Sequence, residues 1–189
     1  MHEIRFHGRG GQGTVVASIL LAKAFFKTGY YVQTFPLFGV ERRGAPVEAY
    51  LRLDKEKILV RSNIYTPDHV IVQDVKLFDS IDVTKGLKPG GSILINSNKL
   101  PNHMEPFSGL RLAFVDADHI AAENGLGTRT HPIINTAMIG AFAKVLGMPP
   151  LDRIAQAIKN EIHVKSDQNI LAAQQAYKKV TLHGIVEHH

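Results

Sequence analysis

The chain has 189 residues, a formal net charge of +5, 44% hydrophobic and 21% charged residues, and no cysteine. This length and composition predict one globular domain with its own hydrophobic core. The lack of cysteine excludes disulfides, a cysteine nucleophile, and zinc or iron–sulfur sites held by thiolates of this chain.

Signal-peptide and membrane-span patterns are missing from the sequence. The longest apolar-leaning run, 15–22, is interrupted by Ser18 and is much shorter than the ~20 residues of a membrane span. We therefore expect a soluble, cytoplasmic protein with no membrane partner. Its single domain is expected over residues 1–186. Residues 187–189 (Glu-His-His) resemble the start of a purification tag and are left out of any argument about metal binding.

Hydrophobic periodicity predicts an α/β fold. The first helix carries Val15, Ile19, Ala22 and Phe26 on one face. Strands are expected over 3–7, 30–35, 47–53, 69–73, 92–95 and 112–115, and helices over 11–27, 132–147, 151–159 and 166–180. This order predicts a single three-layer domain with a mostly parallel sheet and a helical C-terminal third.

A glycine-rich loop, Gly8-Arg9-Gly10-Gly11-Gln12-Gly13, lies between the first predicted strand and the first helix. It fits the G-x-G-x-x-G pattern, in which glycines permit a tight turn, close approach of a ligand, and close helix–strand packing. Free N–H groups at the start of the helix favour an anion. The loop is therefore predicted to bind a phosphate-bearing ligand, or else to serve only backbone packing or a subunit interface.

A free-standing NAD(P)- or FAD-binding oxidoreductase is one alternative. The NAD fingerprint requires an acidic residue at the end of the second strand to bind the ribose. That predicted strand ends at Phe35, and Glu41 lies well beyond it, so the sequence disfavours this alternative. Nucleic-acid binding is also disfavoured, because the lysines and arginines are scattered instead of forming a stripe.

Three more segments, together with the glycine loop, match the motifs of a known protein family in the same order along the chain. Gly8–Gly13 matches G-x-G-G-Q-G, residues 38–47 contain E-x-R-G-A-P, residues 67–72 match P-D-x-V-I-V, and residues 135–142 match N-T-A-M-L-G-A apart from one Ile. Together they resemble the gamma subunit of 2-oxoacid:ferredoxin oxidoreductases. The Arg-Gly-Ala-Pro form of the second loop is similar to members acting on pyruvate and branched-chain 2-oxoacids.

The resemblance implies a multi-subunit enzyme that oxidatively decarboxylates a 2-oxoacid to an acyl-CoA and reduces ferredoxin. It implies that the alpha and beta subunits hold thiamine diphosphate, that the beta and delta subunits hold 4Fe-4S clusters, and that coenzyme A binds in the assembled complex. The gamma chain would be a separate α/β domain packed on alpha, beta and delta. We expect no activity from this chain alone and assign it no catalytic residue or bound cofactor of its own.

The candidate site residues lie in the first two matched segments. An arginine guanidinium can bind phosphate or carboxylate bidentately. For Arg42 and Arg43 the alternative is a solvated loop or an ion pair within the chain, and Gln12 could equally cap its own loop. Adjacent arginines on an extended segment point to opposite sides, and the family's arginine falls on Arg43 instead of Arg42. The predicted site, close to coenzyme A or to a partner subunit, comprises Gly8, Gly10, Gly11, Gln12, Gly13, Arg43 and Gly44.

Other polar residues are first assigned structural roles. Asn135 is expected to bond local backbone or a ligand, and Asp116 and Asp118 to cap a helix after a strand. His7 is expected to be a strand residue and His131 a helix-start residue. Because no His, Asp or Glu group has metal-ligand spacing, the sequence predicts no metal site.

Overall fold

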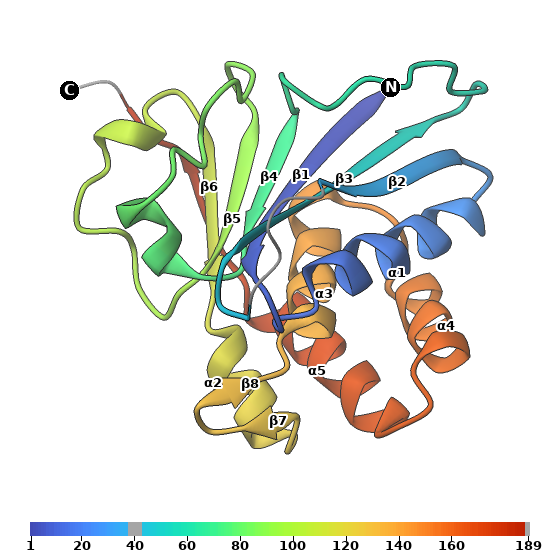
Figure 1. Cartoon of the computed structure of the whole chain (residues 1–189). Helices are drawn as coiled ribbons and strands as arrows, with labels where there is room; N and C mark the ends of the chain where they lie inside the picture. Colours follow the sequence, from blue (N-terminus) through green and yellow to red (C-terminus); the bar gives the residue numbers. More distant parts are fainter. Residues whose placement is uncertain (38–42, 188–189) are drawn as a thin grey trace.

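Seven strands form one mixed β-sheet in the order β2-β3-β1-β4-β5-β6-β9 within residues 1–37 and 43–187, which the computed structural model describes (Figure 1). The strands are β1 (His2–Arg9), β2 (Tyr31–Leu37), β3 (Pro46–Asp54), β4 (His69–Val72), β5 (Ser92–Asn96), β6 (Arg111–Val115) and β9 (Thr181–Ile185), with a separate pair β7 (Gly127–Thr128) and β8 (His131–Pro132). The helices are α1 (Thr14–Phe26), α2 (Ala117–Glu123), α3 (Asn135–Leu146), α4 (Leu151–Glu161), α5 (Ser166–Lys179) and the 3₁₀ helices η1 (Val75–Asp79) and η2 (Glu105–Phe107).

Five strands of this sheet point the same way, which confirms the mostly parallel prediction. β1, β4, β5 and β6 pair in parallel. β3 is antiparallel to both β1 and β2, so β2 is the fifth strand that points the same way as β1. β9 is antiparallel to β6. The sequence did not indicate the direction of β3, and it gave no sign of β9, whose residues are all exposed at the edge of the sheet.

The sheet separates two hydrophobic cores. Side chains from all five α-helices pack with one face of the sheet, including Phe6, Leu51, Ile71 and Leu94. The other face, over β4, β5 and β6, is covered by side chains of η1, η2 and their connecting segments. The third layer of the domain is thus built from 3₁₀ helices and loops within the described residues, while the α-helices lie together on one side (Figure 1).

Two helix starts differ from the predictions. α1 begins at Thr14 and not at Gly11, because the glycines form the turn that precedes it. α3 begins at Asn135, since Pro132 belongs to the short strand β8. No helix in the described part of the chain is long and apolar enough to span a membrane.

The predicted apolar face of α1 is only partly buried. The helix packs inward through its other apolar residues, including Leu20, Leu21 and Phe25. Ile19 and Phe26, expected to share an apolar face with Val15 and Ala22, are 37% and 62% exposed.

Helices α3 and α5 approach each other closely at Gly140. A Cβ atom at this position would lie 2.6 Å from the Cα of Ala173, so no larger residue fits without moving backbone. Helices α3 and α5 therefore pack backbone against backbone at this point.

Candidate functional site

The glycine-rich loop lies at the carboxyl end of β1, where the chain turns into α1. Gly11 and Gly13 have φ angles of 95° and 71°, a left-handed conformation that favours glycine. Gly8 is needed for a different reason: a Cβ there would collide with the Thr14 hydroxyl and lie 2.7 Å from Gln73 Oε1. The glycines therefore serve both the turn and the packing of β1 against α1.

Backbone hydrogen bonds join this loop to the second predicted loop. The Gly10 N–H donates to the Ala45 carbonyl at 2.9 Å, and the Gly44 N–H donates to the Gly10 carbonyl at 3.1 Å. The Arg9 guanidinium also donates to the Gly44 carbonyl at 3.0 Å. Two segments more than 30 residues apart in the sequence thus form one surface. Residues 38–42, which include Glu41 and Arg42, lie outside the described residues.

An open hollow of about 660 Å³ lies over the joined loops. It is lined by glycines that expose their main chain, by the first turn of α1 and by two arginines. The lining residues are Arg9, Gly10, Gly11, Gly13, Thr14, Val15, Val16, Arg43 and Val47. Of the predicted site residues, Gly10, Gly11, Gly13 and Arg43 line it. Gly8, Gln12 and Gly44 instead shape the loops behind it.

The charges around this hollow suit an anion. Gly13 is the N-cap of α1, no side-chain cap is made there, and the first turn contains no acidic residue. No side chain of the first turn therefore offsets the partial positive charge of the helix start. Arg43 is exposed beside it, and Arg9 adds a second guanidinium. Such a site can bind a phosphate or carboxylate.

Sequence reasoning missed Arg9 and Asp74 as members of this site. Arg9 Nε donates to Asp74 Oδ2 at 3.0 Å, an ion pair between residues 65 positions apart. The Asp74 carboxylate also accepts from the Lys76 N–H at the start of η1. Arg9 occupies the first x position of the G-x-G-x-x-G motif, where any residue type is allowed. Its place just before the start of α1 is the sequence feature that could have indicated a role in binding an anion.

The Gln12 amide caps its own loop, as the structural interpretation predicted. Its Oε1 accepts from the Arg9 N–H at 2.7 Å, and its Nε2 donates to Asp74 Oδ2 at 3.3 Å. The side chain therefore holds the loop closed by bonds within the chain.

The remaining candidates also make local contacts. Asn135 Oδ1 accepts from the Thr136 N–H, and Asp116 Oδ1 accepts from the His119 N–H at the start of α2. Asp118 lies in the first turn of α2, where burial raises the pKa of its carboxyl. The expectation that His131 starts a helix is wrong, because His131 lies in β8 and contacts the Thr130 hydroxyl, while α3 begins at Asn135.

A buried polar cluster lies beneath β1 and β3 on the face opposite the helices. Arg5 Nε donates to His7 Nε2 at 2.9 Å, and Tyr50 donates to Glu48 Oε2 at 2.7 Å. Burial, with the charge of Arg5, lowers the pKa of His7 to about 3, so this imidazole is neutral at physiological pH. Burial together with Glu48 raises the pKa of the Tyr50 hydroxyl, and burial lowers the pKa of Arg5. His7 is thus a buried strand residue, as predicted.

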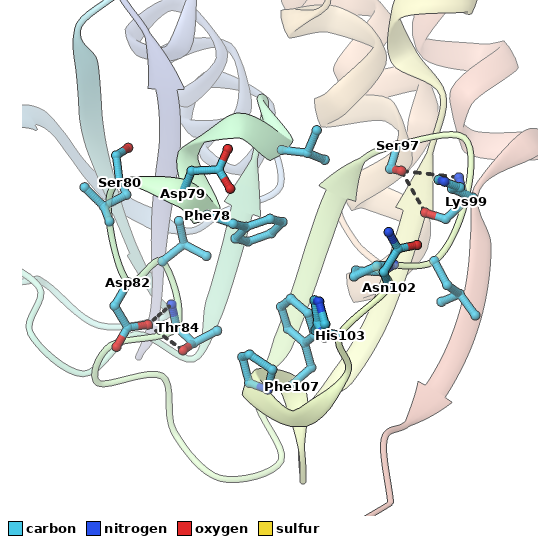
Figure 2. Close-up of a pocket in the computed structure, with 16 residues that line it drawn as sticks. Phe78, Asp79, Ser80, Asp82, Thr84, Ser97, Lys99, Asn102, His103 and Phe107 are labelled. Carbon is cyan, nitrogen blue, oxygen red and sulfur yellow. Dashed lines mark hydrogen bonds between the residues drawn. The ribbon is translucent and has the colours of Figure 1, made fainter.

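A second, larger groove of about 960 Å³ lies on the same side as that cluster, over β4 and β5 (Figure 2). It has apolar and charged lining residues from two connecting segments. Within the described residues, no group of three or more His, Asp or Glu side chains is placed to hold a metal ion. Neither hollow therefore offers a metal centre made from these ligands.

The chain matches known proteins over nearly its whole length. The model of the family "Pyruvate ferredoxin/flavodoxin oxidoreductase" matches residues 3–179. A Thermococcus kodakarensis protein named pyruvate/ketoisovalerate oxidoreductases common subunit gamma is 47% identical, covering 98% of this chain and all of that protein. Pyruvate synthase subunit PorC of Methanocaldococcus jannaschii is also 47% identical, covering 95% of this chain and 97% of that protein.

A solved structure supports the same relationship. The pyruvate oxidoreductase subunit PORC from Thermotoga maritima is 33% identical, with a TM-score of 0.81 and coverage of 96% of this chain and 98% of that one. Fold, family match and relatives agree across the full domain. The chain therefore belongs to the pyruvate ferredoxin/flavodoxin oxidoreductase family, among its gamma-type subunits.

Proposed function

We propose that this chain is the gamma subunit of a heteromeric 2-oxoacid:ferredoxin oxidoreductase that converts pyruvate or a branched-chain 2-oxoacid to its acyl-CoA. Relatives named as gamma or PorC subunits, matched over nearly their whole length, support this function. The domain would act only when assembled with alpha, beta and delta subunits, which would pass electrons to ferredoxin.

Redox chemistry would lie in the partner subunits. The chain has no cysteine with which to ligate an iron–sulfur cluster. In this proposal, thiamine diphosphate and 4Fe-4S clusters reside in the other subunits. The gamma domain supplies a surface for assembly and a binding site for part of coenzyme A.

The hollow between the joined loops carries the coenzyme A proposal. Coenzyme A has a pyrophosphate and a further phosphate, and the hollow combines an uncapped helix start with Arg9 and Arg43. Arg9 is fixed by the Gly44 carbonyl and by the Asp74 carboxylate, which balances part of its charge, so it would provide a positioned hydrogen-bond donor. Arg43 would provide a second, exposed guanidinium for a phosphate oxygen. The other predicted members, Gly8, Gln12 and Gly44, would preserve the shape of the loops.

Reconstitution tests the assembly part of this proposal. The chain is mixed with purified candidate alpha, beta and delta subunits, and CoA-dependent reduction of ferredoxin by pyruvate is measured. Omission of the gamma chain should abolish the activity. Failure to form a complex, or undiminished activity without this chain, would overturn the proposal.

Substitution of Arg43 tests the coenzyme A part. In the reconstituted enzyme, Arg43→Ala should raise the KM for coenzyme A about 10-fold, since a charge-assisted hydrogen bond contributes about 1.5–3 kcal/mol when well formed. The KM for pyruvate should not change. Arg61→Ala, an exposed arginine in the β3–β4 connection, is the matched control. An unchanged KM for coenzyme A would assign the hollow to subunit packing instead.

A further inference from the structure

The larger groove lies on the sheet face opposite the α-helices (Figure 2). One wall is the connection from β4 to β5, which begins with η1. The other wall is the connection from β5 to β6, which includes η2. Both connections leave the carboxyl ends of buried parallel strands.

The floor of the groove is apolar. Phe78 and Phe107 meet edge to face with ring centroids 5.6 Å apart, and Leu100 lies beside them in the same hydrophobic cluster. Val75, at the start of η1, lines the groove with 41% of its surface exposed. Apolar side chains of the second core therefore continue outward into an open surface.

The two walls carry opposite charges. Asp79 and Asp82 line one wall, while Lys99 lines the other. The walls also have their own hydrogen bonds. Asp82 Oδ1 accepts from Thr84 on one side. On the other side, the Ser97 hydroxyl donates to the Lys99 carbonyl. The groove thus has a preformed shape with one acidic and one basic side.

This groove occupies a position that parallel sheets normally fill with helices. Such sheets are usually covered by helices on both faces. Here every α-helix of the described residues contributes to the core on the other face. A helix laid in the groove would complete the third layer.

The lining favours a peptide over a small ligand. A small-molecule site usually has converging polar groups that fix the ligand's orientation. Within residues 1–37 and 43–187, the buried side-chain atoms without a hydrogen-bond partner belong to His7, Thr14, His69, Gln73 and Ser166, and none of these residues lines the groove. An apolar floor between charged walls instead matches the helix-in-groove mode of recognition.

We propose that this groove binds an amphipathic helix of a partner subunit of the oxidoreductase. The apolar stripe of that helix packs on Phe78, Leu100 and Phe107. Cationic residues on one flank face Asp79 and Asp82, and anionic residues on the other flank face Lys99. The opposite charges of the walls select one direction for the bound helix. This inference rests on the proposed function, because the helix comes from another subunit of the same enzyme.

Site-specific crosslinking tests which segment occupies the groove. Because the chain has no cysteine, Asn102→Cys on the groove wall provides a single thiol for a photo-crosslinker. Asn160→Cys, exposed on α4, is the matched control on the helical layer. In the reconstituted complex, the groove label should crosslink to a partner helix with the charge pattern described above. Crosslinking to a second copy of this chain, to a non-helical segment, or to nothing would overturn the inference.

Charge reversal tests the same contact by affinity. Asp79→Lys should weaken binding of the gamma chain to its partner subunits at least 10-fold, measured by interferometry. Asp152→Lys, at an exposed carboxylate on α4, should change it less than 3-fold. Thermal melting of each isolated variant checks its folding. If the wild-type chain does not assemble, the proposed function itself fails. If it assembles and Asp79→Lys binds as tightly as wild type, only the groove proposal fails.

Discussion

The two faces of the sheet are covered to different degrees. On the helical face, five helices close a continuous apolar core, and Gly140 brings α3 directly against α5. On the opposite face, β1 and β3 carry buried charged and polar side chains, including Arg5, His7 and Arg52. The rest of that face is covered by 3₁₀ helices and loops that leave a groove.

This difference separates stability from recognition within one small domain. The helical face supplies most of the apolar burial that stabilises the fold. The opposite face depends on paired charges and leaves apolar surface accessible. In a subunit that functions with partners, the less complete face is the better surface for them. The predictions below test this contrast, beginning with the largest expected effect.

The first prediction concerns the closed helical face. Gly140→Val should destabilise the domain by about 3 kcal/mol or more, because the added atoms collide with the backbone of Ala173. Urea unfolding measures the change. The smaller Gly140→Ala should also destabilise. A gain of about 1 kcal/mol, as helix propensity alone would give, would contradict the close packing.

The second prediction concerns a buried ion pair on the opposite face. Arg52, 1% exposed, donates to Glu3 Oε1 at 2.7 Å. Glu3→Ala should lower the free energy of unfolding by about 3 kcal/mol, because it leaves a buried guanidinium without its carboxylate. Lys88→Ala, which breaks the more exposed pair with Asp68, should cost less than about 1 kcal/mol. Equal losses in the two variants would remove the distinction between buried and exposed pairs.

The third prediction uses two buried histidines, one on each face of the sheet: His7 on the opposite face, and His69, whose ring meets Phe142 of α3, on the helical face. Burial lowers the pKa of His7 to about 3 and that of His69 to about 4. Unfolded histidine titrates near pH 6.5, so below that pH the unfolded chain binds protons that the native state excludes. Stability should therefore be full above pH 6.5 and fall as the pH drops toward 4, by up to about 1.4 kcal/mol per pH unit for each histidine.

Urea midpoints at pH 7 and pH 5 measure this effect. His7→Gln keeps an acceptor for Arg5 and removes one titrating group, so its stability should change less between these two pH values. A variant with the same pH dependence as wild type would show that His7 is not the group excluded from protonation.

The fourth and smallest prediction compares two glycines with similar backbone conformations. Gly13 and Gly29 have φ angles of 71° and 80°. Alanine at either position should cost about 1 kcal/mol for the left-handed conformation. Gly13→Ala should cost about 1 kcal/mol more, because its Cβ would lie 2.7 Å from Asn135 Nδ2, whereas Gly29 has open space around it. Equal losses would mean that Asn135 shifts freely.

Local patterns predicted the parts of this fold that local forces determine. The apolar runs of β4 and β5, and the strand–glycine–helix order around Gly11, follow from residue type and spacing. β9 could not be predicted in this way, because its exposed residues are ordered by pairing with β6. Similarly, the Arg9–Asp74 ion pair joins residues far apart in sequence, so composition and periodicity carry no trace of it.

The site shows the same division. Motifs identified both loops, and a helix start suited to phosphate with an arginine in the second loop suggested that they act together. Their mutual hydrogen bonds depend on the antiparallel pairing of β1 with β3, which brings Arg9 opposite Pro46. A register of this kind is a property of the folded sheet.

The fastening of the two loops has a consequence for how this domain can vary. Gly10, Gly44 and Ala45 are joined through main-chain atoms, which every amino acid except proline supplies in full. Side chains around the hollow can therefore change while the spacing of the loops persists. The proposed ligand would meet loops already held by these hydrogen bonds, so binding would cost little conformational entropy in their main chain.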